Sequence, residues 1–245
     1  VKEFENIFND LFSSRTKIYK QIVKVLSKTS LTYKQLASVI DYPSGGPLSQ
    51  YLDDLILAGF ISLDHSWSIR TSEFSKHAKY RIKDNYLRCY LRYIGPNLKK
   101  IEAETFQVKS LSTLPAWSSI LGLQFENLVL NNRLLLIKEL GIRLEDIVID
   151  NPYYQKSTTL IKGCQIDYLI QTRQKTLYAC EIKFSQQEVS TTIINEMEEK
   201  LKRLNIPRGF SVCPVLIHVN GVTDQVIEED YFLRIIDFSQ IPDRL

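Results

Sequence analysis

Residues 164–184 read CQIDYLIQTRQKTLYACEIKF, two apolar runs on either side of a polar turn. The first run carries Asp167, and the second ends in Glu181, Ile182 and Lys183. Side chains alternate across a strand, so Glu181 and Lys183 share one face. If the two runs pair as a hairpin, Asp167 and Glu181 meet near one end of it. The stretch therefore predicts two short strands that bring two carboxylates and a lysine together.

Two converging carboxylates repel each other unless a hard divalent cation neutralises them. Mg²⁺ fits such a pair, because it takes one or two carboxylates and completes its octahedron with water and phosphate oxygens. We therefore expect Asp167 and Glu181 to hold Mg²⁺, with Mn²⁺ as a substitute. The ion would lower the pKa of an attacking water and offset charge on a phosphate, while Lys183 orients that water or stabilises the emerging charge. Glu126, on an expected helix over residues 118–140, is a further candidate carboxylate.

A solvent-exposed role is the alternative for these side chains. Glu-x-Lys pairs are common decoration on exposed strands, which applies to Glu181 and Lys183. Helix surfaces are rich in glutamate, which applies to Glu126. Asp167 is harder to explain in this way, because burial of an aspartate without a partner is costly.

Residues 116–245 show the element order of a mixed α/β domain. The helix comes first, followed by expected strands at 147–149, 163–170 and 176–184, a helix over 189–204, and strands at 212–219 and 232–238. Pro115 marks the start of this domain.

Residues 1–82 are expected to form a winged helix-turn-helix domain, with three short helices and a small two-stranded wing. Thr32 and Gln35 form a capping box at the start of the second helix, and Pro47 suits the first turn of the third. A helical connector over residues 83–115 follows.

Positive charge is concentrated in the first part of the chain. Residues 1–100 hold 16 Lys and Arg against 9 Asp and Glu, whereas residues 101–245 hold 15 against 19. A basic half suits DNA as a partner, although solvated lysines on helix faces explain it equally well. The expected third helix lacks Arg and Lys at its exposed positions, so we place phosphate contacts elsewhere. The candidates are Lys34, Arg70, Lys76, Lys79 and Arg81.

The second half resembles the PD-(D/E)XK nuclease superfamily, whose restriction-endonuclease-like core is a helix, a three-stranded meander, a helix and a further strand. Gln165-Ile166-Asp167 and Glu181-Ile182-Lys183 match its strand motifs, and Glu126 matches its helical glutamate. The proline that usually precedes the aspartate is absent. The resemblance implies a metal-dependent DNA endonuclease fold.

The whole chain is similar to the C-terminal region of a family of archaeal and bacterial P-loop ATPases, in which an AAA-type ATPase domain precedes a winged helix and a nuclease-like domain. This resemblance implies a DNA-associated ATPase, with the ATPase domain as a partner. The chain has no G-x-x-x-x-G-K-[ST] loop, so we expect no ATP site here. We expect the ATPase domain to precede Val1, in keeping with the absent start methionine.

The sequence favours a DNA-binding winged helix fused to a Mg²⁺-dependent endonuclease-like domain. One alternative is a catalytically inactive nuclease-like scaffold that regulates the ATPase, since winged helices also dock proteins. A transcriptional regulator would explain the first half alone. No apolar run is long enough for a membrane span, and the four cysteines form no CxxC pair. We therefore expect no membrane partner and a cytoplasmic location.

Overall fold

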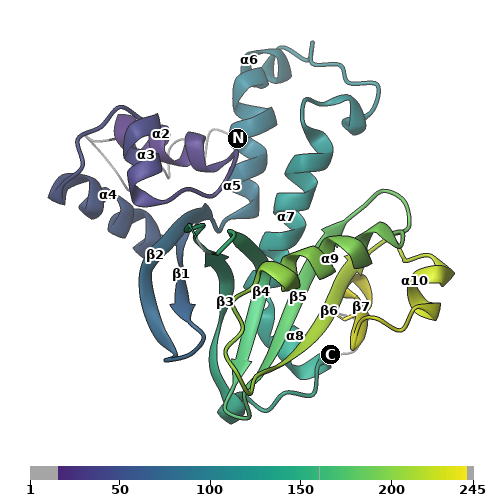
Figure 1. Ribbon diagram of the computed structural model, residues 1–245. Coiled ribbons are helices and arrows are strands. Elements are labelled where there is room, and N and C mark those ends of the chain that lie inside the picture. The colour runs from purple at the N-terminus through teal and green to yellow at the C-terminus, as the bar shows by residue number, and fades with distance from the viewer. Residues whose placement is uncertain (1–15, 160, 242–245) are drawn as a thin grey trace. The chain divides into compact units, whose positions relative to one another are not determined.

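The computed structural model describes residues 16–159 and 161–241 (Figure 1). The first fifteen residues of the expected winged-helix domain and the last four of the expected nuclease-like domain lie outside this range. The described residues form two compact units, one of residues 16–64 and 78–114 and the other of residues 65–77 and 115–241. Residues 65–77 thus belong with the second unit, although we expected them in the first domain.

The first unit contains three helices, a two-stranded hairpin whose tip belongs to the second unit, and further helices. The elements are α2 (Thr16–Leu26), α3 (Tyr33–Val39), α4 (Gly46–Leu57), β1 (Ile61–Ser68), β2 (Glu73–Ile82), α5 (Asn85–Cys89), the π-helical turn η2 (Tyr90–Ile94), α6 (Gly95–Glu102) and the 3₁₀ turn η3 (Leu111–Thr113). Helices α2 to α5 and the two strands share one core, to which Ile22, Leu36, Leu52 and Ile82 contribute fully buried side chains.

Helix starts in this unit are set by local hydrogen bonds. The backbone N–H of Gln35 donates to Thr32 Oγ1 at 3.4 Å, and the N–H of Thr32 donates to Gln35 Oε1 at 3.0 Å. This is the predicted capping box. Pro47 lies in the first turn of α4, and Asp84 Oδ1 accepts from the N–H of Leu87 at 2.6 Å. These bonds occupy backbone groups that a helix start leaves open, which explains why the sequence located the helices well.

The second unit is a mixed α/β structure around a five-stranded sheet. Its elements are α7 (Trp117–Asn131), α8 (Arg133–Glu139), η4 (Leu144–Asp146), β3 (Ile147–Gln155), β4 (Cys164–Thr172), β5 (Thr176–Phe184), α9 (Thr192–Arg203), β6 (Ser211–Val219), α10 (Asp224–Glu228), β7 (Arg234–Asp237) and η5 (Phe238–Gln240). The strands lie in the order β3-β4-β5-β6-β7. The pairs β3–β4 and β4–β5 are antiparallel, and β5–β6 and β6–β7 are parallel.

Helices cover both faces of this sheet (Figure 1). On one face, Ile193 and Met197 of α9 pack with Ala179 of β5. On the other face, Phe125 of α7 packs with Cys180, the next residue along β5. Since successive strand residues point to opposite faces, the two clusters are separated by the sheet.

Two details of the second unit differ from the sequence expectation. The helix expected over 118–140 is interrupted at Asn132, whose side-chain amide donates to Leu128 O at 2.8 Å. The first strand is longer than expected and runs to Gln155. All four cysteines lie in the described part of the chain and are free thiols. Within the residues that the structure describes, no helix combines the length and the apolar character needed to cross a membrane.

Candidate active site

Asp167 and Glu181 lie on neighbouring strands at the same end of the β4–β5 ladder. The last paired residues at this end are Tyr168 and Cys180, so Asp167 and Glu181 come next on their strands. Asp167 Oδ2 accepts a hydrogen bond from the backbone N–H of Ile182 at 3.0 Å. The N–H of Ile182 is thus bonded to a side chain instead of to a main-chain carbonyl group of β4. This bond fixes the Asp167 carboxylate beside β5.

A bulge in β4 affects the direction of Asp167. Asn151 of β3 pairs with Leu169, whereas Tyr153 pairs with Ile166, so β4 carries one more residue than β3 between these two pairs. Bulges bend a strand and re-aim a side chain, and they are frequent beside active sites. Asp167 lies within this irregular segment, so strand alternation alone does not determine where its carboxylate points.

Helix α9 brings two further charged side chains to this end of the sheet. Lys183 Nζ forms an ion pair with Glu196 Oε2 at 2.7 Å, and Lys200 Nζ forms one with Glu181 Oε2. Glu196 and Lys200 are one helical turn apart, which places them on the same side of α9. Sequence reasoning missed both residues. The available signal was their position beside the buried Met197 on the predicted helix.

The charges of this group are coupled. Burial raises the pKa of Glu181 to about 7, and the nearby Asp167 carboxylate adds to the effect against the opposing influence of Lys200. Burial also raises the pKa of Asp167, although Lys200, the N–H of Ile182 and Lys183 oppose this. Burial tends to lower the pKa of Lys200, but the two carboxylates outweigh it, so the net change is upward. The carboxylates therefore repel each other and depend on cations for their charged form.

His218 extends the site across the parallel strands. It pairs in register with Lys183 on one side and with Asp237 on the other. Its neighbour two residues back, Leu216, belongs to the cluster packed by α9, so the imidazole faces the same side as the charged group. His218 is 5% exposed, and within the described residues its Nδ1 has no hydrogen-bond partner. Burial lowers the pKa of His218 against the opposing influence of Asp237, so the imidazole is neutral at neutral pH.

The side chains at this site can be compared with the ligands that Mg²⁺ prefers in proteins. Within the described residues, no three His, Cys, Asp or Glu side chains group closely enough to enclose a metal ion. Asp167 and Glu181 supply two carboxylates, which suits Mg²⁺ because this ion usually keeps several waters and uses few protein ligands. Their mutual repulsion is the feature that a cation would relieve. In the structure, the ammonium group of Lys200 performs this neutralisation at Glu181.

The contacts described above, which bring Asp167, Glu181 and Lys183 together, do not involve Glu126. It is partly buried on α7, next to Phe125, and α7 packs on the sheet face opposite α9. The carboxylates and lysines described above lie at the face covered by α9. A role for Glu126 in the site stays a prediction.

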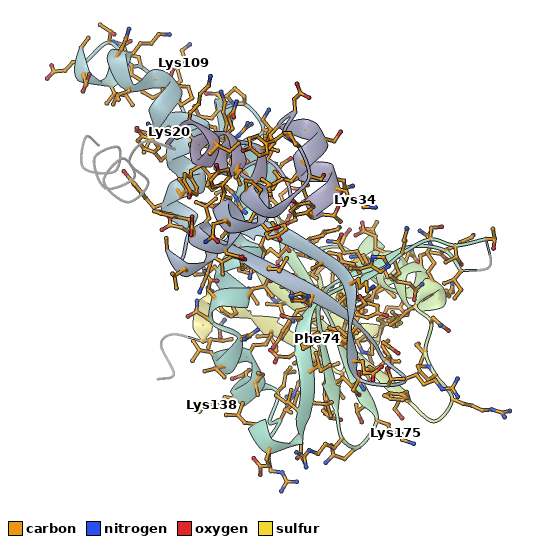
Figure 2. All side chains as sticks on the ribbon, turned by 90° about the vertical axis from the view of Figure 1, so that its left-hand side faces the viewer. Lys20, Lys34, Phe74, Lys109, Lys138 and Lys175 are labelled. Carbon is orange, nitrogen blue, oxygen red and sulfur yellow. The ribbon has the colours of Figure 1, made fainter. Side chains whose placement is uncertain are left out.

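The expected DNA contacts fall into two groups. Lys34, Arg70 and Lys76 are exposed, and Figure 2 shows Lys34 extending away from its helix. Lys79 is partly buried. Arg81 differs, because its Nε lies 2.6 Å from Asp64 Oδ2 and both side chains are about nine-tenths buried or more. The buried pair removes Arg81 from the candidate phosphate contacts and gives it a structural role.

No known protein-family model matches the chain. Over 108 residues the chain is 32% identical to "Uncharacterized protein MJECL04" of Methanocaldococcus jannaschii, which is 44% of this chain and 24% of that protein. The chain thus spans about a quarter of the length of this relative.

Two solved structures are similar to parts of the fold. One is a repair endonuclease from Pyrococcus abyssi, with a TM-score of 0.31 and 14% identity over 46% of this chain and 44% of that chain. The other is protein VC1899 from Vibrio cholerae, with a TM-score of 0.38 and 13% identity over 96% of this chain and 50% of that chain. At these TM-scores both similarities are weak.

Proposed function

We propose that the second unit is a Mg²⁺-dependent, endonuclease-like domain that acts on DNA. The observation that carries the proposal is the convergence of Asp167, Glu181 and Lys183 at one end of β4 and β5, as the sequence motif requires. Buried carboxylates with raised pKa values, held beside lysines, are typical of functional sites.

Each residue has a definite part in this chemistry. Asp167 and Glu181 would hold Mg²⁺, which when bound supplies a more acidic water and positive charge near the phosphate. Lys183 would hold the scissile phosphate or the attacking water by hydrogen bonding, after release from Glu196. The neutral imidazole of His218 can accept a proton at its free Nδ1. Lys200 must release Glu181 before that carboxylate can hold an ion.

A second candidate function is a catalytically inactive scaffold. The ion pairs of Glu181 with Lys200 and of Lys183 with Glu196 favour it, because the charges of both motif residues are already paired with other side chains of the same chain. A nuclease-like domain of this kind would serve as an interaction module for an ATPase domain of the full-length protein.

We also propose that the first unit is a winged helix that binds DNA, and that the chain is the C-terminal part of a DNA-associated, AAA-type ATPase. The order of three helices and a hairpin before the α/β unit supports the first proposal. The exposed Lys34 supplies a basic group for phosphate contacts. The partner in the second proposal is an ATPase domain of the full-length protein.

The decisive experiment incubates the purified chain with supercoiled and linear DNA, with Mg²⁺, with Mn²⁺ and with EDTA. We expect metal-dependent cleavage that Asp167→Asn and Lys183→Ala abolish. Lys138→Ala, which removes an exposed lysine on α8, serves as the matched control and should cut normally. If the wild type and both site variants leave DNA equally intact, the scaffold function replaces the nuclease function. Equal cleavage by all variants would indicate a contaminating enzyme and remove the support for this site.

A further inference from the structure

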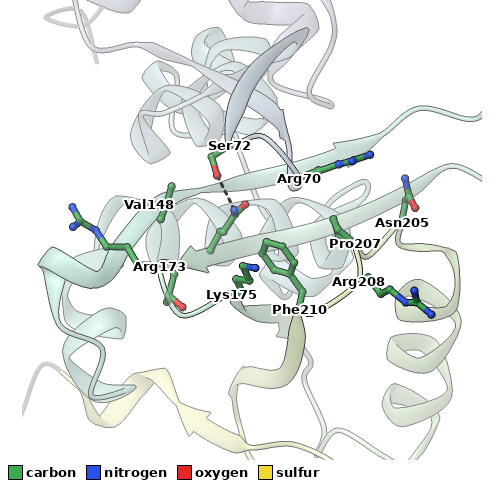
Figure 3. A pocket seen from close by; sticks show the side chains of 11 residues that line it. Arg70, Ser72, Val148, Arg173, Lys175, Asn205, Pro207, Arg208 and Phe210 are labelled. Carbon is green, nitrogen blue, oxygen red and sulfur yellow. Dashed lines mark hydrogen bonds between the residues drawn. The ribbon is translucent and has the colours of Figure 1, made fainter.

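A basic cavity lies in the second unit at the end of the sheet where β4 turns into β5 (Figure 3). Its volume is about 720 Å³. Four segments line it: the hairpin tip, Val148 of β3, the end of β4 with the β4–β5 turn, and the loop between α9 and β6. These segments contribute four cationic side chains, which are Arg70, Arg173, Lys175 and Arg208.

The hairpin tip is fixed in this position by one buried side chain. Gln171 of β4 accepts a hydrogen bond from Trp67 Nε1 at 2.6 Å, and its own amide donates to Ile69 O at 3.0 Å and to Ser72 Oγ at 2.9 Å. Gln171 is only 3% exposed. Because Arg70 lies between two residues bonded to Gln171, its backbone is held at the edge of the cavity.

The β4–β5 turn is also ordered by hydrogen bonds. The N–H of Lys175 donates to Thr172 O at 3.1 Å, and Lys175 O accepts from the N–H of Ser211 at 3.0 Å. The N–H of Arg173 donates to Asp146 O at 2.9 Å. The two cations of this turn therefore start from fixed backbone positions, which reduces the ordering that a ligand would have to impose.

Carboxylates neutralise the positive charge of the cavity only in part, since Asp146 interacts electrostatically with Arg173. Among the described residues, none of the four cations forms an ion pair with Asp or Glu. Asp146, which lies near Arg173, is already hydrogen-bonded to Arg143 and Gln174. Four cations around one cavity, none of them in an ion pair within the described residues, indicate an anionic ligand with more than one charged or hydrogen-bonding group.

The cavity also contains an aromatic side chain. Phe210 is partly exposed and lies among the cations in Figure 3. A ring beside positive charges is the combination with which proteins hold a nucleotide, the base stacked on the ring and the phosphate on Arg or Lys. The volume is within the range of ligand pockets and is too small for a duplex.

We propose that this cavity binds a nucleotide unit, with its phosphate on Lys175 and its base against Phe210, while Arg173 and Arg208 supply positive charge on either side (Figure 3). The unit comes either from a single strand of nucleic acid or from a free nucleotide. Arg173, the first residue after β4, follows Asp167 by six residues, a separation of about 20 Å at ~3.3 Å per residue. The cavity is therefore separate from the candidate active site, and binding there does not depend on cleavage.

The test uses the full chain with Asp167→Asn in the background, so that cleavage does not interfere. Binding of a fluorescein-labelled single-stranded oligonucleotide is measured by anisotropy, and competition uses AMP, ATP, a duplex and inorganic phosphate. We expect Arg173→Ala combined with Lys175→Ala to weaken binding at least about tenfold, because the change removes the phosphate contact of Lys175 and the positive charge of Arg173. Lys109→Ala combined with Lys138→Ala removes the same charge elsewhere and should change binding less than about twofold.

The ring is tested by Phe210→Leu, which keeps an apolar side chain but removes stacking. We expect it to weaken the oligonucleotide or nucleotide about tenfold and to leave inorganic phosphate unaffected. Competition by AMP or ATP identifies a free nucleotide as the source, and competition by unlabelled single strand alone identifies a strand. Equal binding by wild type and both cavity variants, with circular dichroism showing all of them folded, would overturn the proposal. So would an equal loss in the control double variant.

Discussion

Lys200 of α9 forms an ion pair with Glu181, the buried carboxylate that the sequence motif places on β5. The side chain of Glu181 is 4% exposed and that of Lys200 is 29% exposed, so the pair lies mainly inside the protein. The lysine provides positive charge where two carboxylates would otherwise repel each other. The same contact stabilises the metal-free protein and competes with any cation that binds Glu181.

We predict that Lys200→Met destabilises the protein in the absence of metal by about 2 kcal/mol, because removal of one partner leaves a buried carboxylate without its counter-charge. Protonation of Glu181 limits the loss, since its pKa is already raised to about 7. Urea unfolding measures the change. Lys202→Met, two residues along the same helix, breaks only exposed ion pairs and should leave stability nearly unchanged.

The same variant separates the two proposed functions of the site. If Asp167 and Glu181 hold Mg²⁺, the ion should stabilise Lys200→Met more than the wild type, since no ammonium group competes for Glu181. Adding Asp167→Asn should remove this gain. A melting temperature that Mg²⁺ leaves unchanged in the wild type and in Lys200→Met would contradict a metal site and favour the scaffold.

The motif residues could be placed from the sequence, but their partners could not. Asp167, Glu181 and Lys183 were predictable because strand alternation and a short turn are local properties of the chain. Glu196 and Lys200 were not predictable, because the direction in which their side chains point depends on how α9 is rotated over the sheet. That rotation follows from long-range packing of Ile193 and Met197, which the sequence shows only as an apolar stripe.

The hairpin shows a second limit of sequence reasoning. The sequence places the whole hairpin in the first domain, yet Trp67 of β1 and Ile69 after it are buried in the core of the second unit. Two large apolar side chains near the tip were the available signal. The expected role of Arg81 failed for a similar reason, because its pairing with Asp64 depends on the register between β1 and β2.

We predict that Asp64→Asn destabilises the first unit by about 3 kcal/mol, because it leaves the buried guanidinium of Arg81 without its counter-charge. The control is Asp53→Asn, which changes an exposed carboxylate on α4. Thermal unfolding measures both. DNA affinity should be unchanged in whatever fraction of Asp64→Asn remains folded, because Arg81 does not reach the surface. A weaker affinity in the folded fraction would return Arg81 to the DNA-binding surface.

We predict that His218 makes the protein less stable in mild acid. Burial lowers its pKa below the ordinary value of 6.5, while Lys183 and Asp237 flank it in register and Glu196 of α9 pairs with that lysine. As the pH falls through 6.5 and then through the folded-state pKa, the unfolded chain binds a proton more readily than the folded protein. The contribution of His218 to stability is therefore present above pH 6.5 and is lost below the folded-state pKa.

Urea unfolding at pH 7.5 and pH 5 tests whether the stabilising contribution of His218 is lost in acid. The wild type should lose more stability between these values than His218→Gln, which cannot titrate. His77→Gln, a change at an exposed histidine of the hairpin, should behave as the wild type does. Equal losses in the wild type and His218→Gln would mean that the imidazole is charged, or solvated, in the folded protein.

We predict that Gln171→Leu loosens the hairpin tip while the sheet stays folded. The change removes the acceptor of Trp67 Nε1 and the donor to Ile69 O, both buried, and the donor to the partly buried Ser72 Oγ. An unpaired buried donor costs about 1–3 kcal/mol. Gln174→Leu is the matched control, because Gln174 is exposed and its one described bond reaches Asp146.

Hydrogen exchange measured by mass spectrometry distinguishes a loosened tip from general instability. We expect faster exchange over residues 66–74 in Gln171→Leu, with the amides of β5 and β6 unchanged, and no change at either place in Gln174→Leu. Since the backbone of Arg70 depends on the same three bonds, nucleotide binding by the basic cavity should weaken in parallel. Unchanged exchange at the tip would show that Trp67 and Ile69 hold the hairpin by apolar packing alone, and the hydrogen bonds of Gln171 would then have no part in shaping the cavity.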